Sequence, residues 1–144
     1  MKNILLIALL FTSAVYSQGG DRIKAFKAAH ITNALDLTSA EAEKFWPVYN
    51  AHEKKMTALR RRERKEIFQI IRGNMDGLTE KEADDLIEKG IQFKTTELQY
   101  FKDLVQNLRG VIPSKKIVRL RKAEEEFKRI LLERMRNRQK KRDK

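Results

Sequence analysis

The sequence predicts an all-α protein built from four helices. Apolar residues recur at intervals of three and four along most of the 144 residues, and strand-like alternation is not sustained. Charged residues make up 36% of the chain, against about a quarter in an average globular protein. Only two prolines and six glycines interrupt it. We therefore expect long helices with narrow apolar stripes and charged outer faces.

Residues 1–17, which precede the first of these helices, have the pattern of a secretory signal peptide. Lys2 supplies a positive charge, residues 4–15 are mainly apolar, and Ser17 is a small residue before Gln18. The apolar run is too short to cross a bilayer, which takes roughly 20 residues. We expect cleavage between Ser17 and Gln18 and export to the periplasm as a soluble protein.

Export changes how the charge of the chain is interpreted. A formal net charge of +12 would by itself indicate a nucleic-acid-binding protein. An exported protein does not meet nucleic acid as its ordinary partner, so we expect none unless export fails. The chain has no cysteine, which excludes disulfides and thiol catalysis. We expect one helical domain over residues 18–138, held by packing alone, and a basic tail over residues 139–144.

The first helix is expected over residues 21–35 and the second over residues 39–72. Thr38 and Glu41 have the spacing of a capping box at the start of the second helix. Pro47 lies inside this helix, where a kink would either shape a curved surface or only allow neighbouring aromatic side chains to pack. The apolar positions of these helices are Ile23, Phe26, Ile31, Leu35, Phe45, Tyr49, His52, Met56 and Leu59, followed by Ile67, Phe68, Ile70 and Ile71.

A turn over residues 73–77 separates the second and third helices. Thr79 and Glu82 repeat the capping box, Gly110 ends the third helix, and Ser114 is expected to cap the fourth. In the third helix we expect these residues to face inward: Ala83, Leu86, Ile87, Ile91, Leu98, Phe101, Leu104, Val105 and Leu108. In the fourth they are Ile117, Leu120, Phe127, Ile130, Leu131 and Met135.

Two basic runs could attract an acidic partner. Residues 54–65 contain seven basic side chains and one acid, Glu63. In a helical hairpin centred near Met75, the acids of residues 84–88 would lie beside this run and neutralise much of it, so both interpretations stay open. Residues 134–144 are expected to be a solvated tail, with weak contact to an anionic membrane surface or to unfolded chains as the alternative.

No pattern in the sequence indicates catalysis. A glycine-rich phosphate loop, an HExxH zinc motif and a recognisable nucleophile context are all missing from the sequence, so we expect neither an enzyme nor a cofactor. His30 and His52 are weak metal-ligand candidates. With a turn near Leu37 they would lie ~12 Å apart along the helix axis and could not share an ion within one subunit.

The string Leu37-Thr38-Ser39-Ala40-Glu41, at a helix start in an exported four-helix chain, resembles the LTxxQ family of small periplasmic proteins that includes the Spy and CpxP chaperones. Residues 37–50, with Phe45-Trp46-Pro47-Val48-Tyr49 at their centre, are still more similar to the subgroup described as sensor of ECF-type sigma factor. Glu41 replaces the glutamine of the family motif. The second family box is reduced to residues 112–116, and the histidine-rich segments of the metal-sensing members are missing from the sequence.

The resemblance implies a coiled-coil-like hairpin, an antiparallel cradle-shaped homodimer, and a basic concave face with apolar patches. It also implies an ATP-independent, chaperone-like function in envelope stress, with unfolded or acidic polypeptides as partners. The alternative is a regulatory module acting on a membrane signalling protein, such as an anti-sigma factor or a sensor kinase. For polypeptide contact we expect the apolar residues Trp46, Tyr49 and Met56 and the basic residues Arg60, Arg61, Arg64, Arg119, Arg121 and Lys122.

Overall fold

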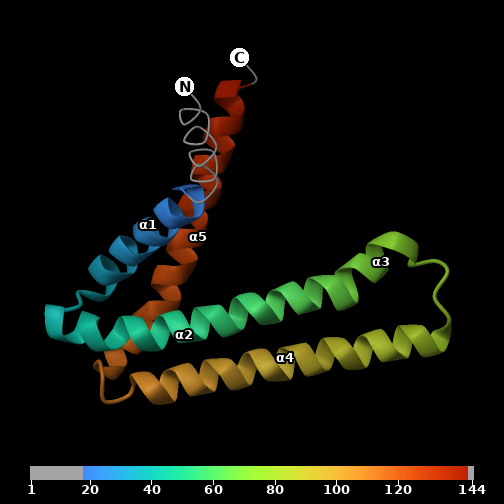
Figure 1. The fold of residues 1–144 in the computed structure, drawn as a ribbon, viewed down its shortest axis with the longest axis horizontal. Helices are drawn as coiled ribbons and strands as arrows, with labels where there is room; N and C mark the ends of the chain where they lie inside the picture. Colours follow the sequence, from blue (N-terminus) through green and yellow to red (C-terminus); the bar gives the residue numbers. More distant parts are fainter. Residues whose placement is uncertain (1–17, 143–144) are drawn as a thin grey trace, which may run out of the picture. The chain divides into compact units, whose positions relative to one another are not determined.

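The computed structural model describes residues 18–142, which are helical along almost their whole length (Figure 1). In chain order, the elements are α1 (Gln18–Leu35), α2 (Ser39–Glu63), the π-helical turn η1 (Arg64–Phe68), α3 (Gln69–Asn74), α4 (Glu80–Leu108) and α5 (Ser114–Arg142). The all-α prediction is confirmed for this part of the chain. None of its helices is long and apolar enough to cross a membrane. The predicted signal peptide lies outside the described residues.

The described chain divides into two compact units. One contains residues 18–37 and 118–142, which are α1 and most of α5. The other is Thr38–Ile117, which holds α2, η1, α3, α4 and the first turn of α5. The sequence predicts a single helical domain over residues 18–138.

In the unit formed by α1 and α5, aromatic and cationic side chains join the two helices. The rings of Phe26 and Phe127 lie 5.4 Å apart, and the guanidinium of Arg134 lies 3.9 Å from the centre of the Phe26 ring. His30 places its Nε2 atom 3.1 Å from the carbonyl oxygen of Ala123. These contacts fix α1 against the middle of α5.

A left-handed residue ends α1. Asp36 has a φ of 49°, and its amide donates to the carbonyl of Asn33 over 3.1 Å. The amide of Leu37 donates to the carbonyl of Thr32, also over 3.1 Å. These two bonds form the Schellman motif, here with aspartate at the position that glycine usually takes. The chain therefore turns sharply just before Thr38.

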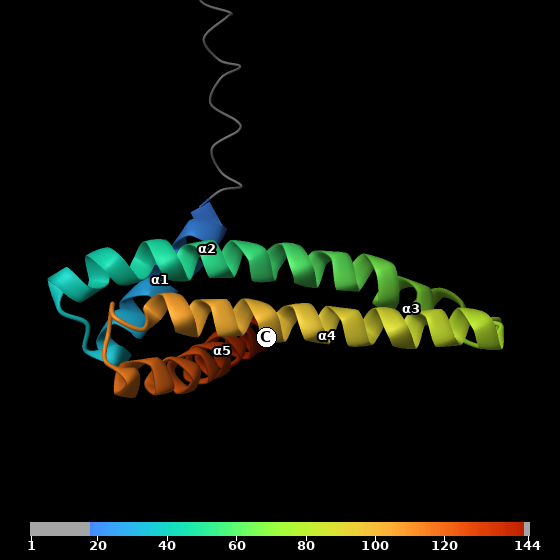
Figure 2. The same cartoon turned by 90° about the horizontal axis from the view of Figure 1, so that it is seen from below.

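In the other unit, α2 and α4 run antiparallel and side by side, as Figures 1 and 2 both show. Their shared core is built on buried apolar side chains, with further apolar side chains packed against it: Met56, Leu59, Ile67 and Phe93, then Ile71, Leu86 and Tyr100. Lys55 lies over the ring of Tyr100 and Arg62 over the ring of Phe93, each at 5.6 Å. Counted along the sequence, the midpoint of each pair falls between residues 77 and 78. The hairpin therefore turns later than the predicted centre at Met75.

The π-helical turn η1 corrects the prediction of one uninterrupted α-helix over residues 39–72. The eight residues from Leu59 to Ile67 would advance an α-helix by roughly 80° beyond two turns. In the wider η1 turn, the amide of Gln69 donates to the carbonyl of Arg64, and this turn compensates for the extra rotation. Ile67 and Ile71 therefore stay on the α4 side of the hairpin.

The predicted core is correct for the apolar residues of α2, although His52 is only half-buried, and it is partly wrong for α4. The predicted residues that are buried are Ile31, Leu35, Phe45, Tyr49, Met56, Leu59, Ile67, Leu104, Leu108, Leu120 and Phe127. The predicted residues that are exposed instead are Ile23, Phe68, Ile70, Ile87, Ile91, Leu98, Phe101 and Met135. On α4 the apolar residues form two stripes about 100° apart, and only the stripe containing Leu86, Phe93 and Leu104 faces α2.

Candidate polypeptide-binding surface

A shallow groove of about 340 Å³ runs between α2 and α4. Pro47, Val48 and Leu104 give it apolar walls, and Lys55 and Asp103 bring charge to it. The remaining lining residues are Ala51, His52, Tyr100 and Asn107. α2 continues as an α-helix through Pro47, which is one of the residues that line the groove.

The aromatic residues predicted to contact polypeptides pack on one another at the start of α2. The Tyr49 ring stacks on Phe45 at 5.3 Å, and Trp46 meets both rings edge-on at 5.0 and 5.5 Å. Tyr49 is buried, as is Met56 further along the helix, while Trp46 is half-buried. The prediction of a contact surface at Tyr49 and Met56 is therefore wrong, because both side chains belong to the core.

The basic run of α2 and η1 stays exposed. Its seven basic side chains are all exposed: Lys54, Lys55, Arg60, Arg61, Arg62, Arg64 and Lys65. Arg62 pairs with Glu66 at 3.3 Å. Among the described residues, no ion pair joins the run to Asp84, Asp85 or Glu88. The late hairpin turn explains this, because it places those acids about one helical turn closer to the tip than predicted.

Beside this run, the π-helical turn leaves apolar side chains exposed near the hairpin tip. Phe68, Ile70 and Met75 are 40–65% exposed. Arg64, Lys65 and Arg72 are exposed in the same stretch. We refer to these six exposed residues together as the tip patch, although Phe68 and Ile70, two positions apart, lie on opposite sides of the helix. Sequence periodicity counted Phe68 and Ile70 as core residues, because the extra residue of the π-helical turn cannot be seen in an apolar pattern.

Of the predicted basic residues on α5, two are paired along their own helix. Arg121 lies 3.5 Å from Glu125, and Lys122 lies 3.8 Å from Glu126. Arg119 is exposed. Exposed pairs at this spacing contribute little to stability, but they reduce the charge available to a partner. Arg121 and Lys122 therefore offer a partner less attraction than Arg60, Arg61 and Arg64, which have no ion pair among the described residues.

The two histidines lie in different surroundings. His30 contacts the Ala123 carbonyl and lies 6.0 Å from the Phe127 ring, while His52 lines the groove between α2 and α4. Within residues 18–142, no three histidine or acidic side chains gather in a way that could hold a metal ion.

Both predicted capping boxes are present. The amide of Glu41 donates to Thr38 Oγ1 over 3.2 Å, and the amide of Thr38 donates to Glu41 Oε2 over 2.9 Å. Thr79 and Glu82 repeat this pattern at 3.3 and 2.8 Å. The predicted cap at Ser114 is wrong, since α5 begins at Ser114 itself and Pro113 precedes it.

The box at Glu41 has a further partner. The Lys116 ammonium group donates to Glu41 Oε2 over 2.7 Å, and the two side chains are only 17% and 19% exposed. The hydrogen bond from Lys116, followed by that from the Thr38 amide, lowers the pKa of Glu41. At Glu82 the bonds from the Thr79 amide and hydroxyl alone lower the pKa. The family-like box therefore ties the start of α2 to the start of α5.

Comparison of this chain with protein-family models, with curated protein sequences and with solved structures found no match.

Proposed function

We propose that this protein is a periplasmic, ATP-independent, chaperone-like protein that binds unfolded or stress-exposed polypeptides. The tip patch is the observation that carries the proposal. It presents Phe68, Ile70 and Met75 to solvent among exposed cations. Unfolded chains expose apolar side chains, and acidic segments among them are attracted by the basic run before contact.

Among the described residues, the basic run forms no ion pair with Asp84, Asp85 or Glu88, and this strengthens the proposal. Arg60, Arg61 and Arg64 keep no acid within ion-pair distance among the described residues, so their field reaches solvent. Exposed cations of this kind speed the encounter with an acidic segment, and the effect weakens as salt screens it. Apolar contact at Phe68 on one side of the helix, or at Ile70 on the other, would then hold the captured segment.

An aggregation assay tests the proposal. The purified protein should suppress light scattering from a reduced or heat-unfolded client at near-stoichiometric ratio and low salt. The double variant Phe68→Ser/Ile70→Ser should lose most of this suppression, because it removes apolar area and leaves the charge. Val118→Ser/Leu132→Ser is the matched control, since both residues are exposed apolar side chains outside the tip patch.

Two outcomes would contradict the proposal. The first is no suppression at low salt, and the second is equal loss in the tip variant and in the control. Lack of suppression together with one stoichiometric membrane partner in envelope extracts would instead support the regulatory module that the resemblance allows.

A further inference from the structure

The end of the hairpin has few buried contacts. Among the described side chains of residues 68–92, none is buried, and the best-covered apolar side chains are half-buried: Ile71, Leu78, Ala83 and Leu86. The buried side chains of Ile67 and Phe93 flank this segment directly. A segment with so little buried apolar surface opens locally at a lower free energy than the helices on which it rests.

Both arms of the hairpin are irregular at the level where this segment begins. Ile67 belongs to the π-helical turn η1, beyond which α3 leaves the direction of α2 (Figure 1). A Cβ atom placed on Gly90 of α4 would lie 4.0 Å from Ile67 Cδ1, which is an ordinary van der Waals contact. Packing therefore leaves room for alanine at position 90, where glycine lowers the stability of the helix. Since π-helical turns kink helices and glycine weakens them, each arm has a weak point at the same level.

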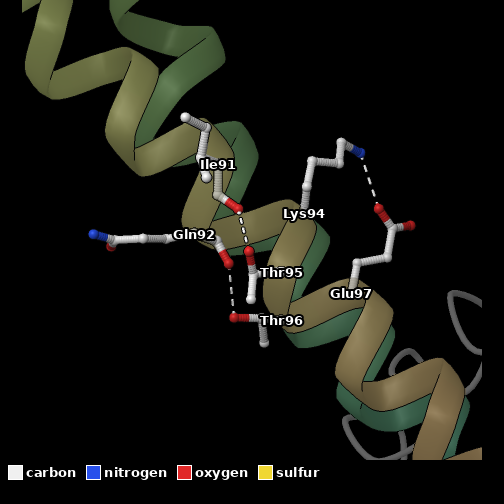
Figure 3. Close-up of polar contacts among 6 residues, drawn as sticks. All are labelled: Ile91, Gln92, Lys94, Thr95, Thr96 and Glu97. Atoms are coloured by element: carbon white, nitrogen blue, oxygen red, sulfur yellow. Dashed lines mark hydrogen bonds and ion pairs between the residues drawn. The ribbon is translucent and has the colours of Figure 1, made fainter.

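α4 carries two further helix-bending residues just after Gly90. Thr95 Oγ1 donates to the carbonyl oxygen of Ile91 over 3.0 Å, and Thr96 Oγ1 donates to that of Gln92 over 2.9 Å, as Figure 3 shows. A threonine that bonds the carbonyl one turn back often bends its helix and lowers its stability slightly. These bonds therefore favour bending of α4 close to Gly90.

Polar contacts do not clamp the two sides of this segment together. Among the described residues, no ion pair joins residues 64–72 to residues 79–89. In the turn between α3 and α4, the Leu78 amide donates to the Met75 carbonyl over 3.4 Å, which is a long hydrogen bond. The segment is therefore held mainly by its half-buried apolar side chains.

We propose that the hairpin tip, residues 68–89, opens as one unit about the contact between Ile67 and Gly90 and so presents further apolar surface to a client. One turn beyond that contact, the antiparallel arms bring Ile71 level with Leu86, and both side chains pack against the hairpin core. Opening turns these side chains toward solvent and adds their area to the apolar part of the tip patch. This role of the opening rests on the proposed chaperone-like function, whereas the hinge itself does not.

Hydrogen exchange of the full chain, with no client present, tests the hinge. Amides of residues 69–89 should exchange at least about tenfold faster than those of residues 93–106, and with similar free energies of opening, because they open together. Gly90→Ala should slow exchange across the tip by about fivefold, because alanine fits beside Ile67 and stabilises α4.

The matched control is Asn50→Ala, which strengthens α2 at an exposed position outside the tip and should leave exchange of the tip unchanged. Equal exchange along the whole hairpin, or equal slowing of the tip in the two variants, would overturn the hinge.

A disulfide across the tip tests what the opening does. The chain has no native cysteine, so none competes with the bridge in Ile71→Cys/Leu86→Cys. Oxidation of this variant should slow exchange of the tip amides and lower the suppression of client aggregation several-fold, and reduction should reverse both effects. Wild type under the same two conditions is the control and should not change.

Equal suppression by the oxidised and reduced forms would overturn the role of the opening in client capture. Rapid exchange of the tip in a wild-type chain that suppresses no aggregation would support the hinge and contradict the proposed function alone.

Discussion

The two capping boxes of this chain have the same local sequence pattern and different surroundings. Thr38 with Glu41 and Thr79 with Glu82 make the same pair of backbone hydrogen bonds at a helix start. Only Glu41 also meets a cation from another helix, Lys116. A capping box can therefore be complete within its own helix and also, where the fold brings a cation beside it, join two helices.

Removing each whole box should give the largest difference. Thr38→Ala/Glu41→Ala and Thr79→Ala/Glu82→Ala each lose a threonine cap, which contributes about 1 kcal/mol. The first variant should be destabilised more, because it also loses the carboxylate that Lys116 contacts. Urea denaturation followed by circular dichroism measures both free energies of unfolding. Equal values would show that the contact with Lys116 adds nothing.

A milder change isolates the charge. Glutamine still completes a capping box, so Glu41→Gln and Glu82→Gln both keep the local hydrogen bonds. Only Glu41→Gln removes the charge that faces Lys116, and we expect a lower melting temperature for it than for Glu82→Gln. Thermal unfolding of the two variants beside wild type is the measurement. A lower melting temperature for Glu82→Gln would contradict the structural role of the Glu41–Lys116 pair.

The smallest effect is expected from pH. Folding lowers the pKa of Glu41 and Glu82 below the ordinary value of 4.5, so each carboxylate stabilises the fold above that pH. This contribution is lost as the pH falls from 4.5 through the lowered pKa. Acid unfolding of wild type and of the variants Glu41→Gln and Glu82→Gln is the measurement. As the pH falls, each variant should lose less stability than wild type. An unchanged slope in Glu41→Gln would contradict the lowered pKa of Glu41.

Helix starts and stops were largely predictable, because they depend on residues close in sequence. Gly110 has a φ of 86°, a conformation that suits glycine, and it follows the end of α4 as predicted. The faces of α4 were not predictable in the same way. Apolar positions 86, 93, 100 and 104 and positions 87, 91, 98 and 101 are both helical series, and nothing local decides which one meets α2.

The exposure of the tip patch was also not predictable from the sequence. The sequence places Phe68 and Ile70 in an apolar cluster, but their exposure follows from a π-helical turn that keeps Ile67 and Ile71 against α4. A later hairpin turn than predicted separates the basic run from its expected acids. Both corrections depend on how two long helices align, and small changes in that alignment alter which side chains meet.

The sequence alone determined the all-α class, the two capping boxes and the turn after α4, because these depend on hydrogen bonds and backbone preferences within a few residues. The tertiary structure decided the register of α2 against α4, the exposed stripe of α4, and the meeting of Lys116 with Glu41 across 75 positions. Such contacts form only when distant helices pack, and the energy that selects among alternative packings is shared by many side chains at once.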